Sequence, residues 1–188
     1  MAINRLEREI DQMALDLLAM EQPMAIDLRF ILSVIKINAD VERVGDSARA
    51  ISDRVRELQA FPVAELPIDI PRIANLSSGM VRKALQAFIE GDAEMAVSVL
   101  AMDDGVDKLN SAAHYTLLNL MKKQPELAPQ ALNALMISRA LERVADHATN
   151  IAEDVIFWVR AADVRHHMGP AAAADGAGRN SQPVAGSQ

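Results

Sequence analysis

A fifteen-residue segment occurs twice in this chain, and the internal repeat limits the fold more than any other feature. The first copy, residues 41–55, reads VERVGDSARAISDRV, and the second copy, residues 141–155, reads LERVADHATNIAEDV. Seven of the fifteen positions are identical. A repeat of this kind indicates two copies of one structural unit, stacked so that they bury a shared apolar face.

Both copies have the apolar spacing of amphipathic helices, with apolar residues three or four positions apart. One face of the second copy carries Leu141, Val144, Ala148, Ile151 and Val155. The breaks between helices are marked by proline or glycine at 22–23, 61–71, 91–92 and 124–125. We therefore predict an all-α protein without strands, whose five helices cover about 3–21, 25–59, 72–90, 93–123 and 128–162. Residues 166–188 have few apolar anchors, which predicts a disordered tail.

Composition removes several classes of protein. The chain has 188 residues and no cysteine, which excludes a disulfide scaffold, thiolate metal sites and cysteine nucleophiles. Its formal net charge is -7, so we expect no nucleic-acid partner, because phosphate backbones bind positive surfaces. It has neither a signal-peptide pattern nor the roughly 20 apolar residues of a membrane helix, which favours a soluble, cytoplasmic protein.

Carboxylates recur along one face of the predicted helices. Glu142, Asp146 and Glu153 are four and seven residues apart, so they lie along one side of the last helix. Asp103 and Asp107 are one turn apart on the preceding helix. If these two helices face each other, four or five carboxylates converge, and oxygen donors of this kind suit hard cations such as magnesium, calcium, manganese or iron.

The same carboxylates also fit an ordinary solvated helix face, since Glu and Asp are common on exposed surfaces. Against this stands the mild cost of like charges one turn apart, and the pattern appears in both copies as Glu42, Asp46 and Asp53. Both interpretations remain open at this point. A di-iron oxidase is excluded, because its Glu-x-x-His motif would need histidine three residues after Glu142, where the chain has Ala145.

The duplicated E-R-V-x-D segments resemble the PhoU family of phosphate-signalling accessory proteins. Asp27-Leu28-Arg29, Ala145-Asp146-His147-Ala148 and Asp163-Val164-Arg165-His166 add to the resemblance, which runs from about Ile3 to His167. It implies two tandem three-helix-bundle repeats with multinuclear metal clusters on acidic stripes, iron first, with zinc, manganese or magnesium as alternatives. It also implies a non-enzymatic negative regulator of the phosphate-starvation response that acts with a phosphate ABC transporter ATPase and a membrane sensor histidine kinase.

The resemblance assigns ligands by position. In the second repeat it implies Asp103, Asp107, Glu142, Asp146 and Glu153, and in the first repeat, more weakly, Glu42, Asp46 and Asp53. The first repeat is weaker because Asn4 stands where the second repeat has Asp107, and an amide lacks the charge that attracts a cation.

The resemblance also predicts the domain organisation. Residues 1–60 form an incomplete first repeat, 61–71 a connector and 72–165 a complete second repeat, because the family's first helix and half of its second have no counterpart here. A misplaced start, a fragment and a short paralogue are alternative explanations.

The missing helix leads to a further expectation, that of a homodimer. A long helix over 26–58 would have too little to cover its apolar residues, which are Phe30, Val34, Ile37, Val41, Val44 and Ile51. We expect a second copy to cover them. The competing functions are a metal-free helical interaction or oligomerisation module and, third, a metal-dependent hydrolase.

Overall fold

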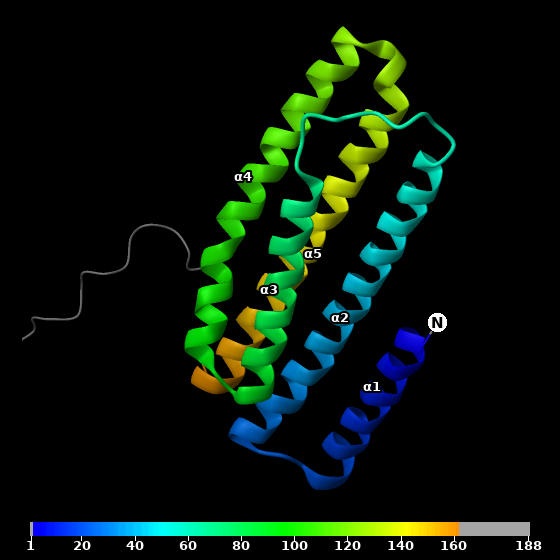
Figure 1. Ribbon diagram of the computed structural model, residues 1–188. Coiled ribbons are helices and arrows are strands. Elements are labelled where there is room, and N and C mark those ends of the chain that lie inside the picture. Colours follow the sequence, from blue (N-terminus) through cyan, green and yellow to red (C-terminus); the bar gives the residue numbers. More distant parts are fainter. Residues whose placement is uncertain (1, 162–188) are drawn as a thin grey trace, which may run out of the picture.

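The computed structural model describes residues 2–161 and confirms an all-α fold (Figure 1). The helices are α1 (Ala2–Glu21), α2 (Ala25–Leu58), α3 (Ile70–Glu90), α4 (Ala93–Lys123) and α5 (Ala128–Arg160), with a short 3-10 turn, η1 (Pro125–Leu127), before α5. No strand occurs among these residues. Each predicted helix is present, with ends within two residues of the predicted ones.

The chain breaks act as their residue types dictate. Gly91 ends α3 in the left-handed conformation with φ 64°, where a side chain would be strained. Asp92 then begins α4, and its carboxylate accepts hydrogen bonds from the backbone N–H groups of Glu94 and Met95, both at 2.9 Å. Between α1 and α2, Gln22 takes a φ of 46° immediately before Pro23.

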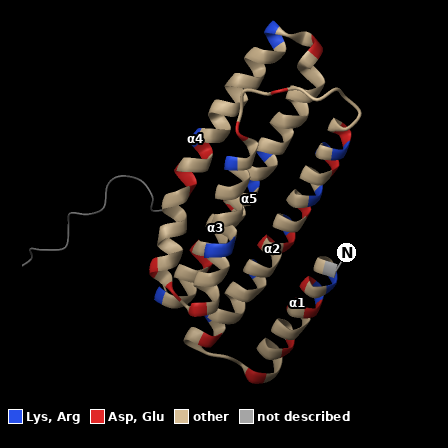
Figure 2. Ribbon diagram, in the orientation of Figure 1, with Lys and Arg blue, Asp and Glu red and all other residues tan. Residues whose placement is uncertain are grey.

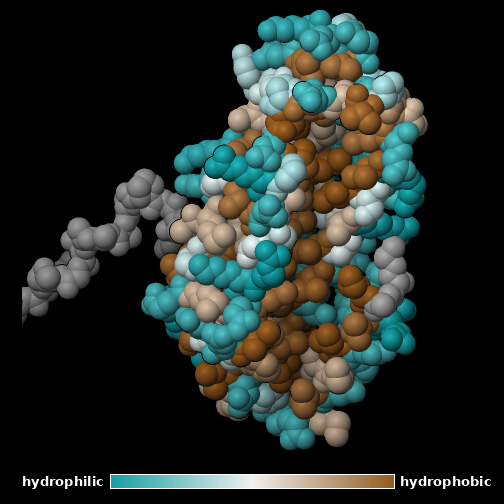
Figure 3. All heavy atoms as spheres, viewed as in Figure 1, coloured by the Kyte–Doolittle hydropathy of each residue, from teal (hydrophilic) through white to brown (hydrophobic). Residues whose placement is uncertain are grey.

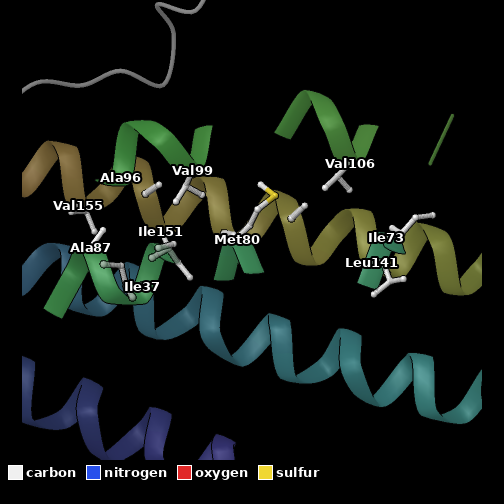
Figure 4. Packing of buried hydrophobic residues seen from close by; sticks show 14 of the residues in the cluster. Ile37, Ile73, Met80, Ala87, Ala96, Val99, Val106, Leu141, Ile151 and Val155 are labelled. Carbon is white, nitrogen blue, oxygen red and sulfur yellow. The ribbon is translucent and has the colours of Figure 1, made fainter. Parts of the chain in front are cut away.

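Helix α5 is the central element of the bundle. It packs against α2, α3 and α4, while α3 and α4 also pack against each other (Figure 1). The face predicted from the sequence is buried, with Val144 at 7% exposure and Ala148, Ile151 and Val155 at 0%. Figure 4 shows the core between these helices, where Met80 of α3 and Val99 of α4 meet Ile151 of α5.

The two repeats meet along α2 and α5, which run antiparallel. Ser33 donates a hydrogen bond of 3.0 Å to the backbone oxygen of Asp154, and Lys36 lies 3.1 Å from the Asp154 carboxylate. Asp40 follows Ser33 by seven residues, which is two turns of α2. Its buried carboxylate lies 2.9 Å from Nδ1 of His147. His147 therefore lies between α5 and α2.

Helix α1 packs against α2 and, within residues 2–161, against no other helix. Its approach is close at Gly45, where an added Cβ would lie 2.8 Å from Cδ1 of Ile3. Asn38 of α2 holds the middle of α1 by donating 2.8 Å hydrogen bonds to the backbone oxygen of Glu7 and to the carboxylate of Asp11. The α1 helix thus has one packed side.

The expectation that the α2 apolar residues lack cover was wrong for Ile37, which is 4% exposed in the core with Ala87 and Ile151 (Figure 4). Val41 and Ile51 are partly buried against the same core. The sequence repeat does not reveal how the repeats pack on each other, and α5 covers much of the α2 face that we expected to be open.

Part of the α2 face is still open to solvent. Phe30 is 39% exposed, although its ring stacks on Phe88 at 5.8 Å and meets Trp158 at 5.0 Å. Val44 and Ile51 line an open apolar hollow of about 530 Å³ between α2, α3 and α5. Figure 3 shows apolar side chains in a lengthwise strip down the middle of this face.

No helix within residues 2–161 is long and apolar enough to cross a membrane. Residues 59–69 connect α2 to α3 without a helix. The disordered tail predicted for 166–188 lies outside the described residues.

Candidate metal-binding site

Four carboxylates of the second repeat share one neighbourhood. Asp103 and Asp107 lie one turn apart on α4, and Glu142 and Asp146 lie one turn apart on α5, which packs against α4. The negative charges of Asp107, Asp146 and Glu142 all act on Asp103. Figure 2 shows the acidic stretch of α4 in red near the middle of that helix. We call these four residues the acidic cluster.

Asp103 is the member of the acidic cluster most affected by its surroundings. Burial, followed by the charge of Asp107, raises the pKa of Asp103 from 3.8 to about 6. Its Oδ1 atom is buried and finds no hydrogen-bond partner among the described residues. A buried oxygen without a partner costs free energy, and a cation would remove that cost.

Glu142 and Asp146 show the same effect on α5. Burial raises the pKa of Glu142, and the charges of Asp146 and Asp107 raise it further. Burial and then the charge of Asp107 likewise raise the pKa of Asp146. Arg139 lowers the pKa of Glu142, and His147 and Arg143 lower that of Asp146, but burial and the neighbouring acids outweigh these effects. Asp107 and Asp146 themselves are exposed, so the acidic cluster lies at the protein surface.

Two polar residues behind Glu142 were not predicted. Asn110 donates a hydrogen bond of 2.6 Å to Oε2 of Glu142, and Ser138 donates to the amide oxygen of Asn110. Asn110 is 6% exposed and Ser138 is fully buried. Helical spacing could have indicated Asn110. It follows Asp103 by seven residues and Asp107 by three, so it shares their face of α4.

Glu153, the fifth ligand predicted for the second repeat, is half-buried on α5. It lies seven residues beyond Asp146, which corresponds to about 10 Å along the helix axis. Asp104 lies beside Asp103 in the sequence, and its charge also raises the pKa of Asp103.

In the first repeat, the predicted ligands are arranged differently. Asn4 of α1 donates a hydrogen bond of 2.8 Å to Oε1 of Glu42. Asp46 is exposed, and exposed Asp53 pairs with Arg56 at 3.3 Å, one turn along the same helix. Asn4, which stands where the second repeat has Asp107, therefore forms a direct hydrogen bond with Glu42.

The donor set of the acidic cluster suits a hard cation, because it consists of carboxylate oxygens with one orphaned buried atom among them. The side chains are not preassembled, however. Within residues 2–161 no three His, Cys, Asp or Glu side chains converge closely enough to hold an ion as they stand. An ion would therefore have to draw the carboxylates of the acidic cluster together.

Comparison with known proteins assigns the family. The sequence pattern of the PhoU domain matches residues 2–55 and 70–155, which include both copies of the repeat and the whole acidic cluster. The chain belongs to the PhoU family. This confirms the resemblance that the duplicated E-R-V-x-D segments carried.

Two curated PhoU relatives are similar along most of the chain. The phosphate-specific transport system accessory protein PhoU homologs of Pseudomonas aeruginosa and Pseudomonas putida are each 40% identical over 167 residues, or 87% of this chain. The chain spans 68% of the first protein and 64% of the second, which is about two thirds of their length.

Solved PhoU structures agree with the fold. The crystal structure of PhoU from Pseudomonas aeruginosa gives a TM-score of 0.82 at 38% identity, covering 86% of this chain and 78% of that one. The regulatory protein PhoU from Streptococcus pneumoniae gives 0.79 at 32% identity, covering 87% and 76%. These PhoU proteins therefore support the helical arrangement as well as the family.

Proposed function

We propose that this chain is a regulatory accessory protein of phosphate uptake and signalling, and not an enzyme. One observation carries the proposal, namely the match to the PhoU domain together with relatives that are named accessory proteins of phosphate-specific transport. In this role the chain represses the phosphate-starvation response from the cytoplasm. Its partners are the phosphate ABC transporter ATPase and a membrane sensor histidine kinase.

The regulatory role is tested in a bacterial strain that lacks its own PhoU protein. The chain is expressed there with a reporter that phosphate starvation switches on, and the cells are grown in excess phosphate. We expect the chain to restore repression, with reporter output at least ten-fold below that of the empty vector. Unchanged output, with the chain present at the level of the native protein, would reject the role.

We further propose that the acidic cluster binds a hard cation, with iron as the first expectation and manganese, magnesium or zinc as alternatives. Asp103, Asp107, Glu142 and Asp146 would hold it, and Glu153, about 10 Å further along α5, would serve a second ion. Support comes from the buried, unpartnered Oδ1 of Asp103 and from the raised pKa values of three of the four acids. When bound, the cation adds to the positive charge that Arg139 and Arg143 already bring to these acids.

The alternative is a metal-free helical interaction module, and the separation of the carboxylates favours it. Elemental analysis of protein purified without chelator distinguishes the two. We expect at least one equivalent of iron or another of the four metals per chain. Protein that is free of metal, and that takes up none when exposed to each of the four, would favour the alternative.

The homodimer remains a proposal. Its support is a line of exposed apolar side chains on α1, the helix with one packed side. These are Leu6 at 50%, Met13 at 57%, Leu17 at 49% and Met20 at 77% exposure. A strip of this kind is rarely left open, so we expect light scattering at micromolar concentration to give the mass of two chains. A monodisperse monomer would reject the dimer.

A further inference from the structure

We propose that Asn110 and Ser138 are positioning residues that hold the Glu142 carboxylate in place for the cation of the acidic cluster. The inference rests on the metal-binding function proposed above and names two residues that the family resemblance did not assign. Its basis is the chain of hydrogen bonds from Ser138 through Asn110 to Glu142.

The direction of these hydrogen bonds follows from the chemistry of the groups. A carboxylate can only accept, so the amide nitrogen of Asn110 must face Oε2 of Glu142. The amide oxygen of Asn110 then faces Ser138, whose hydroxyl must donate to it. Exchanging the amide nitrogen and oxygen would place the amide oxygen against Oε2 of Glu142, where two acceptors would face each other, so the contact with Glu142 fixes the orientation of the amide.

The chain of bonds is anchored in the protein interior. Ser138 is 0% exposed and Asn110 is 6% exposed, whereas Glu142 is half-buried at the edge of the acidic cluster. Buried side chains keep one rotamer because their neighbours leave no room for others. Ser138 and Asn110 therefore restrain the position of the Glu142 carboxylate through hydrogen bonds that begin in the core.

Glu142 needs such support because its neighbours repel it. Asp107 and Asp146 carry the same charge and repel the Glu142 carboxylate, whereas Arg139 attracts it, so the side chain can turn away from Asn110, either out into water or towards Arg139. The hydrogen bond from Asn110 opposes that movement and occupies Oε2 from one side, which leaves Oε1 for a cation. Partners behind metal ligands typically contribute 10- to 100-fold to metal affinity.

The first repeat offers a matched comparison. Asn4 also donates to a glutamate, Glu42, but it does so from the position that aligns with the ligand Asp107. There the amide replaces a ligand, while Asn110 stands behind one. Replacing Asn4 should therefore leave the metal affinity of the chain unchanged.

The test measures the affinity of the chain for Mn²⁺ and, without oxygen, for ferrous iron, by calorimetry. Asn110→Leu removes the donor at similar volume, Ser138→Ala removes one buried hydroxyl, and Asn4→Ala is the control. We expect Kd to rise 10- to 100-fold in Asn110→Leu and about three-fold or more in Ser138→Ala. It should not change in Asn4→Ala. Ser138→Thr keeps the hydroxyl and should bind more tightly than Ser138→Ala.

Thermal melting of the metal-free variants separates positioning from folding, since a purely structural role would lower the Tm without changing Kd. If Asn110→Leu does not fold, Ser138→Ala and Ser138→Thr still decide the matter. Wild-type affinity in Asn110→Leu or Ser138→Ala would overturn the positioning role and leave metal binding intact. A wild-type chain that binds neither metal would overturn both.

Discussion

His147 on α5 and Asp40 on α2 form a buried contact between the two repeats, with 2.9 Å separating Nδ1 from Oδ1. Asn150 lies 3.4 Å from the same oxygen. Asp40 therefore receives polar partners from one turn of α5, at the interface where α2 joins the second repeat.

Removing this carboxylate should weaken the interface. Asp40→Ala leaves His147 and Asn150 without their buried partner, so we expect the free energy of unfolding to fall by about 2 kcal/mol. Urea denaturation followed by circular dichroism measures the change. Asp16→Ala removes a carboxylate from an exposed position and should cost less than about 0.5 kcal/mol. If the free energy of unfolding fell equally in the two variants, the contact between the repeats would contribute no more to stability than an exposed carboxylate does.

The acidic cluster should make the metal-free protein less stable at neutral pH. The pKa of Asp103 is raised in the folded state, so folding favours its protonated form, and the penalty grows as the pH rises from 4 to about 6. Asp103→Asn should therefore be more stable than wild type at pH 7, on the order of 1 kcal/mol after allowance for solvent screening. The difference should shrink towards pH 4. A constant difference across urea titrations at several pH values, with chelator present, would contradict this.

Metal should bind the second repeat more tightly than the first. Glu142→Ala with Asp146→Ala removes two members of the acidic cluster and should abolish most of the bound metal. Glu42→Ala with Asp46→Ala should change little, because Asn4 already pairs with Glu42 and supplies no charge. Metal content after loading and desalting measures both. Equal losses from the two double variants would exclude this ranking.

Two glycines should respond in opposite ways to alanine. Gly91 has a φ of 64°, and an added Cβ would lie 3.4 Å from the Trp158 ring, so Gly91→Ala should cost about 1 kcal/mol or more. Gly105 lies inside α4 with nothing within 4 Å of an added Cβ. Gly105→Ala should raise the free energy of unfolding by about 0.5–1 kcal/mol. Thermal melting of both variants at one pH checks the pair of signs.

Much of the fold could be read from local pattern. Apolar spacing marked the helices, and residues such as Pro23, Gly91 and Pro125 marked their ends, because helix ends depend on nearby residues. Ile37 could not be placed in this way. Its burial depends on α5, more than one hundred residues away, and a repeat states that two units are alike without stating how they pack.

For the candidate site, too, the sequence predicted what depends on helical spacing and missed what depends on packing between helices. Helical spacing put Asp103 beside Asp107 and Glu142 beside Asp146, and the packing of α4 against α5 placed the two pairs in one neighbourhood, although not close enough to hold an ion as they stand. Asn110 and Ser138 were missed because a single buried polar residue gives no periodic signal. Their role is visible only once their hydrogen bonds to each other and to Glu142 are seen.

The single packed side of α1 has a consequence for how the molecule opens. Helix α2 is held by α5 as well as by α1, so the core around Ile151 can be lost only with the whole bundle. Within a single chain, helix α1 can leave by giving up its contacts with α2 alone, at a smaller free energy. The amide hydrogens of α1 should therefore exchange with solvent before those of the other helices. Detachment of α1 is then the local opening that needs the least free energy, while the remaining helices unfold together.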